Sequence, residues 1–321
     1  MKIILVGVGN GNIPPKGWGA CESIVWDYYC NLKNDFDIQF ISEPSTKNII
    51  KKCNKENPDI VHIMYDDYFS IADKLNCKKV YLTTHYAYIT QENFEKKQAG
   101  YFNNIFMPTI KMQNHINLIV LSEEIKNVYI NNGYSASKIN VLRNGAREDA
   151  FRYTINPKYN DKSIYVGKIE HRKSQFKYQS IESIDFVGNY HDSLFDTSKQ
   201  NYLGEWSKDI LYDNLTEYGN LVLLSDGEAD PLVIKEALIC GLGVVISECS
   251  KANLDLSKPF INVISNNKLN DIEYVKYIIE QNRQICKIER ENIRKYGLDV
   301  FSWKNIISDY MNILTISRKI I

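Results

Sequence analysis

Residues 225–241 of this 321-residue chain read SDGEADPLVIKEALICG. Within them, Asp230 suits the N-cap of a helix, Pro231 its first position and Gly241 the left-handed position just beyond its end. We therefore predict a helix from Pro231 to about Cys240. The apolar run just before this segment is typical of a buried strand. A strand, a short loop and a helix in this order are expected where an α/β sheet binds its ligand.

Two glutamates in this segment carry the functional prediction. Glu236 lies inside the predicted helix, and its neighbours three and four positions away are all apolar: Leu232, Val233, Ile239 and Cys240. A carboxylate among aliphatic side chains needs hydrogen-bond donors, and a ribose diol supplies two. Glu228 precedes the helix at the mouth of the same expected crevice. Taken singly, each glutamate also fits a capping or solvated role.

Short apolar runs continue outward from this segment in both directions. The first series covers residues 3–6, 38–41, 60–64, 80–83, 118–121 and 139–142, and the second covers 164–166, 184–187, 221–224, 244–246 and 261–264. Helical stretches separate the runs, which is the pattern of parallel sheets covered by crossover helices. The sequence therefore predicts the α/β class, with two Rossmann-like domains. Residues 151–162, with little apolar periodicity, are the expected linker, and residues 301–316 are expected to form one last amphipathic helix.

Composition narrows the functional class. Lys+Arg and Asp+Glu number 39 each, which argues against a stable nucleic-acid complex. The seven scattered cysteines lack a C-x-x-C pair, so we expect reduced thiols in a cytoplasmic protein and no metal site. No apolar run approaches the ~18 residues of a membrane span. Peripheral membrane contact stays open.

The pair Glu228 and Glu236, seven residues apart and followed by Ala237-Leu238-x-x-Gly241, resembles the E-x7-E signature of family 4 retaining glycosyltransferases of the GT-B fold. Further elements are similar to that family: residues 13–22 to its first glycine-rich loop, 120–123 and 141–146 to its S-E and N-G elements, 165–174 to its G-R-x(4)-K-G stretch, and 301–303 to its closing helix. The resemblance implies two Rossmann-like domains with parallel sheets facing across a cleft. It implies an acceptor-side domain over residues 1–155, a nucleotide-sugar-binding domain over 156–300 and a C-terminal helix over 301–321 that crosses back to the first domain.

Site roles follow from the resemblance, residue by residue. Glu236 would bind the donor's ribose, and Glu228 would approach the transferred sugar as a catalytic residue. His85, which follows the run 80–83, would contact that sugar, and Lys173 would stabilise the leaving diphosphate. The remaining expected donor-binding residues are Gly17, Gly19, Lys168, Arg172, Asp230, Pro231, Leu232 and Val233. The helix tip they include offers free N–H groups and partial positive charge to phosphates.

The chain departs from the family pattern at several positions. Lys168 replaces the usual arginine, so it supplies charge but no bidentate fork, and Arg172 is expected to compensate. Ser174 replaces a glycine. Only about ten residues separate Lys173 from the next predicted strand, too few for the usual crossover helix. Pro231 donates no N–H to a phosphate.

The resulting hypothesis is a metal-independent, retaining glycosyltransferase. Its donor would be a nucleotide diphosphate sugar, with no further cofactor, and its acceptor a glycan or other small molecule. Two alternatives stay open: a nucleotide-sugar 2-epimerase of the same fold, and a non-catalytic nucleotide-sugar-binding protein. The sequence leaves the base, the sugar and the acceptor unassigned.

Overall fold

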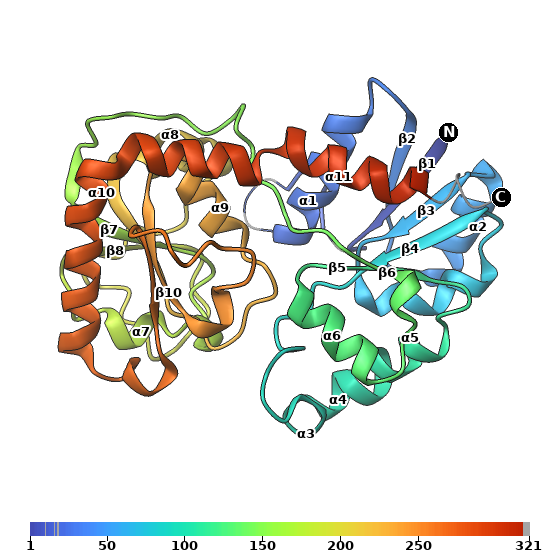
Figure 1. The fold of residues 1–321 in the computed structure, drawn as a ribbon, viewed down its shortest axis with the longest axis horizontal. Coiled ribbons are helices and arrows are strands. Elements are labelled where there is room, and N and C mark those ends of the chain that lie inside the picture. The colour runs from blue at the N-terminus through green and yellow to red at the C-terminus, as the bar shows by residue number, and fades with distance from the viewer. Residues whose placement is uncertain (10, 16, 18, 317–321) are drawn as a thin grey trace. The chain divides into compact units, whose positions relative to one another are not determined.

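The computed structural model describes residues 1–9, 11–15, 17 and 19–316 (Figure 1). The chain folds into two compact units. Of the described residues, unit 1 comprises 1–9, 11–15, 19–144 and 306–316, whereas unit 2 comprises 145–305 and takes in Gly17. Each unit is an α/β structure around one parallel sheet. Among the described residues, no helix is both long enough and apolar enough to cross a membrane.

The sheet of unit 1 has six parallel strands in the order β2-β1-β3-β4-β5-β6. Their bounds are β1 Lys2–Gly7, β2 Asp37–Ser42, β3 Ile60–Ile63, β4 Lys79–Thr83, β5 Asn117–Val120 and β6 Ile139–Val141. Ile3 pairs with Ile38 on one side and with Ile60 on the other. The six strands predicted for this half of the chain are confirmed. Central strands such as β3 are buried along their whole length, which explains their continuous apolar runs.

The helices of unit 1 are α1 Ala20–Leu32, α2 Thr46–Glu56, α3 Phe94–Lys97, α4 Ala99–Tyr101, α5 Met107–Lys111 and α6 Glu123–Asn131. Short helical segments add η1 Asp66–Lys74, η2 Phe102–Phe106 and η3 Ala136–Lys138. Helix α6 begins where the sequence has Ser122-Glu123. The Ser122 hydroxyl accepts a hydrogen bond from the N–H of Ile125 at 3.3 Å and so caps the helix.

The sheet of unit 2 has five parallel strands in the order β11-β10-β9-β7-β8. Their bounds are β7 Tyr159–Val166, β8 Ile184–Val187, β9 Tyr218–Leu223, β10 Gly243–Ser247 and β11 Ile261–Ile264. All five predicted strands are confirmed, and the two-sheet α/β class with them. The core of unit 2 is built from the side chains of these strands and of the helices that cover them.

The helices of unit 2 are α7 Gln175–Tyr178, α8 Lys208–Asn214, α9 Leu232–Ile239 and α10 Ile272–Phe301. Short turns of helix add η4 His171–Lys173, η5 Leu215–Glu217, η6 Glu248–Ser250 and η7 Asn266–Lys268. Helix α7 has only four residues, so the shortened crossover between β7 and β8 is as the sequence predicts. Helix α10, with 30 residues, is the longest element of the unit and was not foreseen.

The structure divides the chain earlier than the expected boundary at residue 155. The units separate between Asn144 and Gly145, and the expected linker 151–162 lies inside unit 2. Phe151 packs edge-on against Tyr212 with their ring centroids 4.8 Å apart, and β7 already begins at Tyr159. An aromatic side chain buried in this way ties its segment to the core of unit 2.

The last predicted helix also begins later than expected. Phe301 belongs to α10, the backbone is extended at Ser302, and α11 runs over Trp303–Ile316. From Ile306 onward this helix is part of unit 1, where the Tyr310 hydroxyl lies 3.0 Å from Nδ1 of His62. The chain therefore returns to its first unit. His62 is fully buried, and the same contact makes it a core residue.

Candidate functional site

Unit 2 has a topological switch point between β7 and β9. These strands are neighbours in the sheet, but the chain leaves β7 toward β8 on one side and leaves β9 toward β10 on the other. The segments that follow the two strands therefore diverge at the carboxyl edge of the sheet. Ligands of α/β proteins bind at such a point. Both stretches that resemble the glycosyltransferase motifs, 165–174 and 225–241, lie there.

A buried tyrosine holds the two segments together. The hydroxyl of Tyr165, in β7, donates to the backbone carbonyl of Lys173 and accepts from the N–H of Leu224 at 2.9 Å. The N–H of Asp226 donates to the carbonyl of Arg172 at 2.7 Å. These bonds fix the cationic residues after β7 against the acidic residues after β9. Sequence reasoning missed Tyr165 because one tyrosine among 22 gave no signal.

Glu228 is the centre of a partly buried ion cluster. Its Oε1 atom lies 2.8 Å from Nζ of Lys173 and 3.0 Å from Nη1 of Arg172, and its side chain is only 9% exposed. Burial acts to raise the pKa of Glu228, but Lys173 and Arg172 together outweigh burial and hold that pKa below its ordinary value. The carboxylate is therefore ionised at neutral pH.

The two expected cations other than Lys173 differ in position. Arg172 also donates to the carbonyl of Gly227 and, at 2.7 Å, to Oε1 of Glu170. Lys168, by contrast, is 45% exposed and lies 3.8 Å from Glu170. Arg172 and Lys173 thus meet Glu228, whereas Lys168 stands outside this cluster.

Helix α9 starts at Leu232, with Pro231 rather than Asp230 at the N-cap position. The Asp230 carboxylate instead forms a buried ion pair with Lys235 and accepts from the Asn253 side chain at 3.0 Å. The predicted cap is wrong because Lys235, one turn into α9, is buried and needs a counter-charge. The predicted helix end is confirmed, since Gly241 follows it with φ of 80°.

The first turn of α9 presents Leu232 and Val233, both half-buried. The first N–H groups of any α-helix have no partner inside the helix, and they attract anions. The four expected residues Asp230, Pro231, Leu232 and Val233 therefore form one helix start at the switch point.

Glu236 is buried one turn further along α9. Within the part of the chain that the structure describes, no hydrogen-bond or ion-pair partner reaches its carboxylate. Burial raises the pKa of Glu236, and the charges of Lys208 and Lys235 offset only part of this effect. Lys208, at the start of α8, was not foreseen, because nothing in the sequence places α8 beside α9. Glu236 is therefore a largely buried carboxylate whose described neighbours supply no hydrogen-bond donor.

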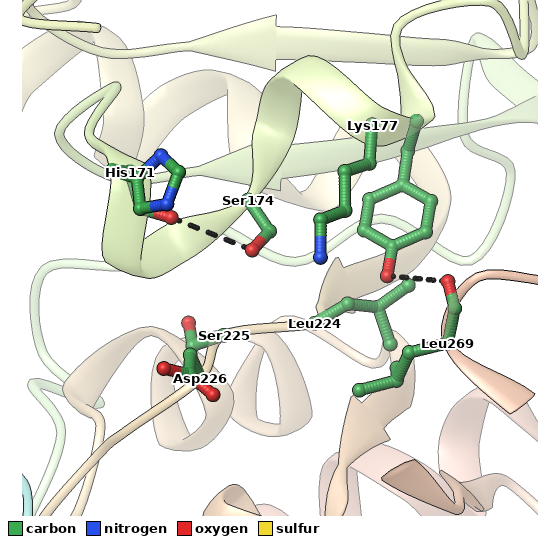
Figure 2. Close-up of a pocket in the computed structure, with 8 residues that line it drawn as sticks. His171, Ser174, Lys177, Leu224, Ser225, Asp226 and Leu269 are labelled. Atoms are coloured by element: carbon green, nitrogen blue, oxygen red, sulfur yellow. Dashed lines mark hydrogen bonds between the residues drawn. The ribbon is translucent and has the colours of Figure 1, made fainter. Parts of the chain in front are cut away.

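A small pocket opens at the same edge of the sheet, with a volume of about 200 Å³ (Figure 2). Ser174 and Lys177 line it from the segment after β7, and Ser225 and Asp226 line it from the segment after β9. The Ser174 hydroxyl donates to the carbonyl of His171, as Figure 2 shows. The pocket is smaller than the ~300 Å³ that whole small-molecule ligands usually need, so it has room for part of a ligand only.

The remaining predicted residues lie near the amino end of the chain. Gly19 directly precedes α1, and Gly17 stands between two residues outside the described ones. His85 follows β4 in unit 1. Burial lowers its pKa to about 4, so the imidazole is neutral at pH 7, and its buried Nε2 atom has no partner among the described residues.

Asp66, just after β3, was not predicted, although the acidic pair at 66 and 67, one residue beyond the apolar run 60–64, was a usable signal. Its Oδ2 atom accepts from the Tyr101 hydroxyl at 3.0 Å, and from the Thr84 hydroxyl and the His85 N–H at 3.3 Å each. Burial raises the pKa of Asp66 to about 7 despite these hydrogen bonds. Unit 1 thus carries a second polar cluster at the carboxyl edge of its sheet.

Comparison with known proteins finds solved structures that share this fold. No protein-family model matches the chain, and no curated protein matches its sequence. Among solved structures, HepE from Anabaena, in complex with UDP-glucose, superposes with a TM-score of 0.70 at 13% identity over 99% of this chain and 100% of that one. Sucrose-phosphate synthase from Thermosynechococcus elongatus gives a TM-score of 0.77 at 13% identity, over 98% of this chain and 99% of that one.

The lipopolysaccharide outer core galactosyltransferase WaaB gives a TM-score of 0.65 at 14% identity, over 99% of this chain and 100% of that one. These matches span essentially whole chains on both sides. The fold is that of the GT-B glycosyltransferases. At such low identity the likeness establishes architecture, and the chemistry has to be argued from the residues.

Proposed function

We propose that this protein is a glycosyltransferase that moves a sugar from a nucleoside diphosphate donor to a glycan or other small acceptor. We further propose that it acts with retention of anomeric configuration and without a metal ion, like the family 4 enzymes that its motifs resemble. The observation that carries the proposal is the pair of glutamates at the switch point of unit 2. Glu228 is buried against two cations, and Glu236 is buried with no partner among the described residues.

Donor binding follows from these two environments. A ribose diol would give the largely buried Glu236 carboxylate two hydrogen-bond donors, where the described residues supply none. The diphosphate would lie at the start of α9, where the N–H groups of Leu232 and Val233 favour negative charge. The Asp230–Lys235 ion pair holds this helix start in place from inside. Lys168, more exposed, adds positive charge at the rim.

The reaction breaks the bond between the sugar's anomeric carbon and a phosphate oxygen. Arg172 and Lys173 would neutralise the negative charge that develops on the leaving diphosphate, the role commonly taken by a cation clamp on phosphates. The ionised Glu228 would stabilise the positive, oxocarbenium-like sugar, and we assign His85 to the same sugar. The acceptor oxygen then bonds to the anomeric carbon on the face that the phosphate leaves, and the departing phosphate oxygen takes its proton.

The setting of the reaction is part of the proposal. The seven cysteines are all thiols, which fits a reducing compartment such as the cytoplasm. A balanced charge of 39 cationic and 39 acidic residues favours small, sugar-like partners over nucleic acid. Peripheral contact with a membrane that carries a lipid-linked acceptor is compatible with this reading.

The first experiment is calorimetric titration of the protein with UDP, GDP and ADP. We expect one of the three to bind, and we would start with UDP because HepE was solved with UDP-glucose. Binding of none would refute the proposal. A turnover assay with the matching nucleotide sugar then separates the reaction classes, because a transferase releases the nucleotide only with transfer to an acceptor or water, whereas an epimerase keeps the nucleotide sugar intact. Excess EDTA should leave the rate unchanged, and product NMR should show retained configuration.

A further inference from the structure

Unit 1 has a switch point of its own, between β1 and β3. The chain leaves β1 toward β2 on one side and β3 toward β4 on the other. Asp66 lies three residues after the end of β3, and His85 lies two residues after the end of β4. The position at which α/β sheets bind ligands is thus occupied by a carboxylate and an imidazole.

The hydrogen bonds of Asp66 are unevenly distributed between its two oxygens. All three donors, from Thr84, His85 and Tyr101, reach Oδ2. Oδ1 is buried and has no partner among the described residues. An ionised carboxylate can accept about four hydrogen bonds over its two oxygens, and the share that belongs to Oδ1 is unused. Leaving a buried acceptor unsatisfied destabilises the protein unless something else uses it.

The groups around Asp66 fit a hydroxyl-bearing ring. His85 adds a second buried polar atom without a partner in the described chain, its Nε2. Tyr101, which donates to Asp66, is stacked on Tyr86 with ring centroids 3.6 Å apart and planes within 4°. Both tyrosines are half-buried, and the Tyr86 hydroxyl donates to Gln98 at 2.6 Å. Hydrogen-bonding atoms beside flat aromatic faces match a sugar, which has hydroxyls at its rim and C–H groups on its faces.

We propose that Asp66 binds a hydroxyl group of a saccharide acceptor, with Oδ1 accepting the hydrogen bond and the Tyr86–Tyr101 pair contacting the sugar ring. This inference rests on the proposed function, since it names the acceptor class and a residue that holds it. It is a binding role, and it needs the half-buried Tyr101 to move so that the sugar reaches Oδ1. The acceptor class that this site selects is therefore a carbohydrate.

The test uses the full chain and saturation-transfer NMR, which detects weak binding of free sugars. The probes are methyl glucoside, N-acetylglucosamine, maltose and lactose. Asp66→Asn is compared with Asp67→Asn, because Asp67 is the adjacent aspartate but is exposed. We expect at least one sugar to bind the wild type and the Asp67 variant equally, and to bind the Asp66 variant about tenfold more weakly, as loss of a charge-assisted hydrogen bond implies.

Each result decides the matter. If none of the four sugars binds the wild type, or if Asp66→Asn binds as well as Asp67→Asn, the inference is wrong. Calorimetry with UDP on the same samples keeps the proposed function separate, since Asp66 lies in unit 1 and both glutamates that carry the donor proposal lie in unit 2. Unchanged nucleotide binding in the Asp66 variant also shows that the protein is folded. A protein that binds sugars but no nucleoside diphosphate would sink the proposed function alone.

Discussion

Replacing Glu236 with glutamine should make the free protein more stable and the nucleotide complex weaker. In the absence of ligand, the carboxylate is buried in α9 with no hydrogen-bond or ion-pair partner among the described residues, and burial raises its pKa. A fully buried polar group without a partner costs about 1–3 kcal/mol, and Glu236, which is 8% exposed, should carry part of that cost. Glutamine keeps the size and one carbonyl oxygen but removes the charge. We expect a gain of roughly 1 kcal/mol, or about 2–4 °C in Tm.

The sign of the pH dependence follows from the direction of the pKa shift. Because the folded pKa of Glu236 lies above the unfolded one, the native state binds more protons between the two values. The free energy of unfolding of the wild type therefore falls as pH rises through that window. Glu236→Gln removes this dependence. The stability advantage of the variant should accordingly be small near pH 4.5 and larger at pH 7 to 8, in thermal unfolding followed by circular dichroism.

Nucleotide affinity should change in the opposite direction. Hydrogen bonds to a charged group contribute about 1.5–3 kcal/mol each, so losing the charge at a ribose diol should cost about 2–3 kcal/mol, or roughly 30- to 160-fold in Kd. Calorimetry with UDP and with 2′,3′-dideoxy-UDP isolates the contact. The wild type should discriminate between the two nucleotides, and Glu236→Gln should not.

The control is Glu291→Gln, an exposed glutamate on α10 of the same unit, which should leave Tm and both affinities unchanged. The reasoning is refuted if Glu236→Gln lowers Tm in the free protein, because the carboxylate would then have a stabilising partner. It is also refuted if the variant loses affinity for UDP and dideoxy-UDP equally.

Three further predictions concern the other charged or strained positions. Lys173→Ala should lower the transfer rate by about 100-fold, because it removes a group that stabilises charge in the transition state. Lys168→Ala, at the exposed edge, should lower the rate less than about fivefold. Steady-state kinetics with saturating donor checks both values. Ser174→Gly should raise the free energy of unfolding by about 1 kcal/mol, because Ser174 has a φ of 53° in the left-handed region. Ser174→Ala keeps this strain and should not raise it. Equal urea midpoints for the two variants would contradict the prediction. The pKa of Asp66 is raised to about 7, so the wild type should lose stability, on the order of 4 kcal/mol at most, as pH rises from about 4 to 7. Asp66→Asn should remove this loss. If the Asp66→Asn and Asp67→Asn variants give parallel stability curves over this range, the assignment fails.

The positions of the strands could be predicted from the sequence. Parallel strands buried on both faces are continuous apolar runs, and β3 and β9 are buried at every residue. Domain boundaries were harder to predict, because they depend on tertiary contacts. Phe151 lies in a stretch that reads as a linker, and only its contact with Tyr212, some sixty residues later, assigns it to unit 2.

The candidate site could be predicted only in part, for similar reasons. Glu228, Glu236, Arg172 and Lys173 lie in recognisable motifs, which is why the sequence could single them out; their roles stay predictions. Lys235 was the exception, because a lysine within an apolar helix reads as a surface residue until its counter-charge is known. Its buried partner is Asp230, which is why the predicted cap at Asp230 was wrong.

The ion cluster around Glu228 also suggests how donor binding and sugar binding are linked in the proposed reaction. Two cations, Arg172 and Lys173, face the Glu228 carboxylate, and Arg172 also pairs with Glu170. A diphosphate carries more negative charge than a single carboxylate, so it would compete with Glu228 for Arg172 and Lys173. Once these cations turn to the phosphates, the two charges that lower the pKa of Glu228 most are lost, and that pKa should rise from its present low position. A positively polarised sugar would then be the group that keeps Glu228 ionised, which places the strongest interaction of this carboxylate in the transition state rather than in the free protein.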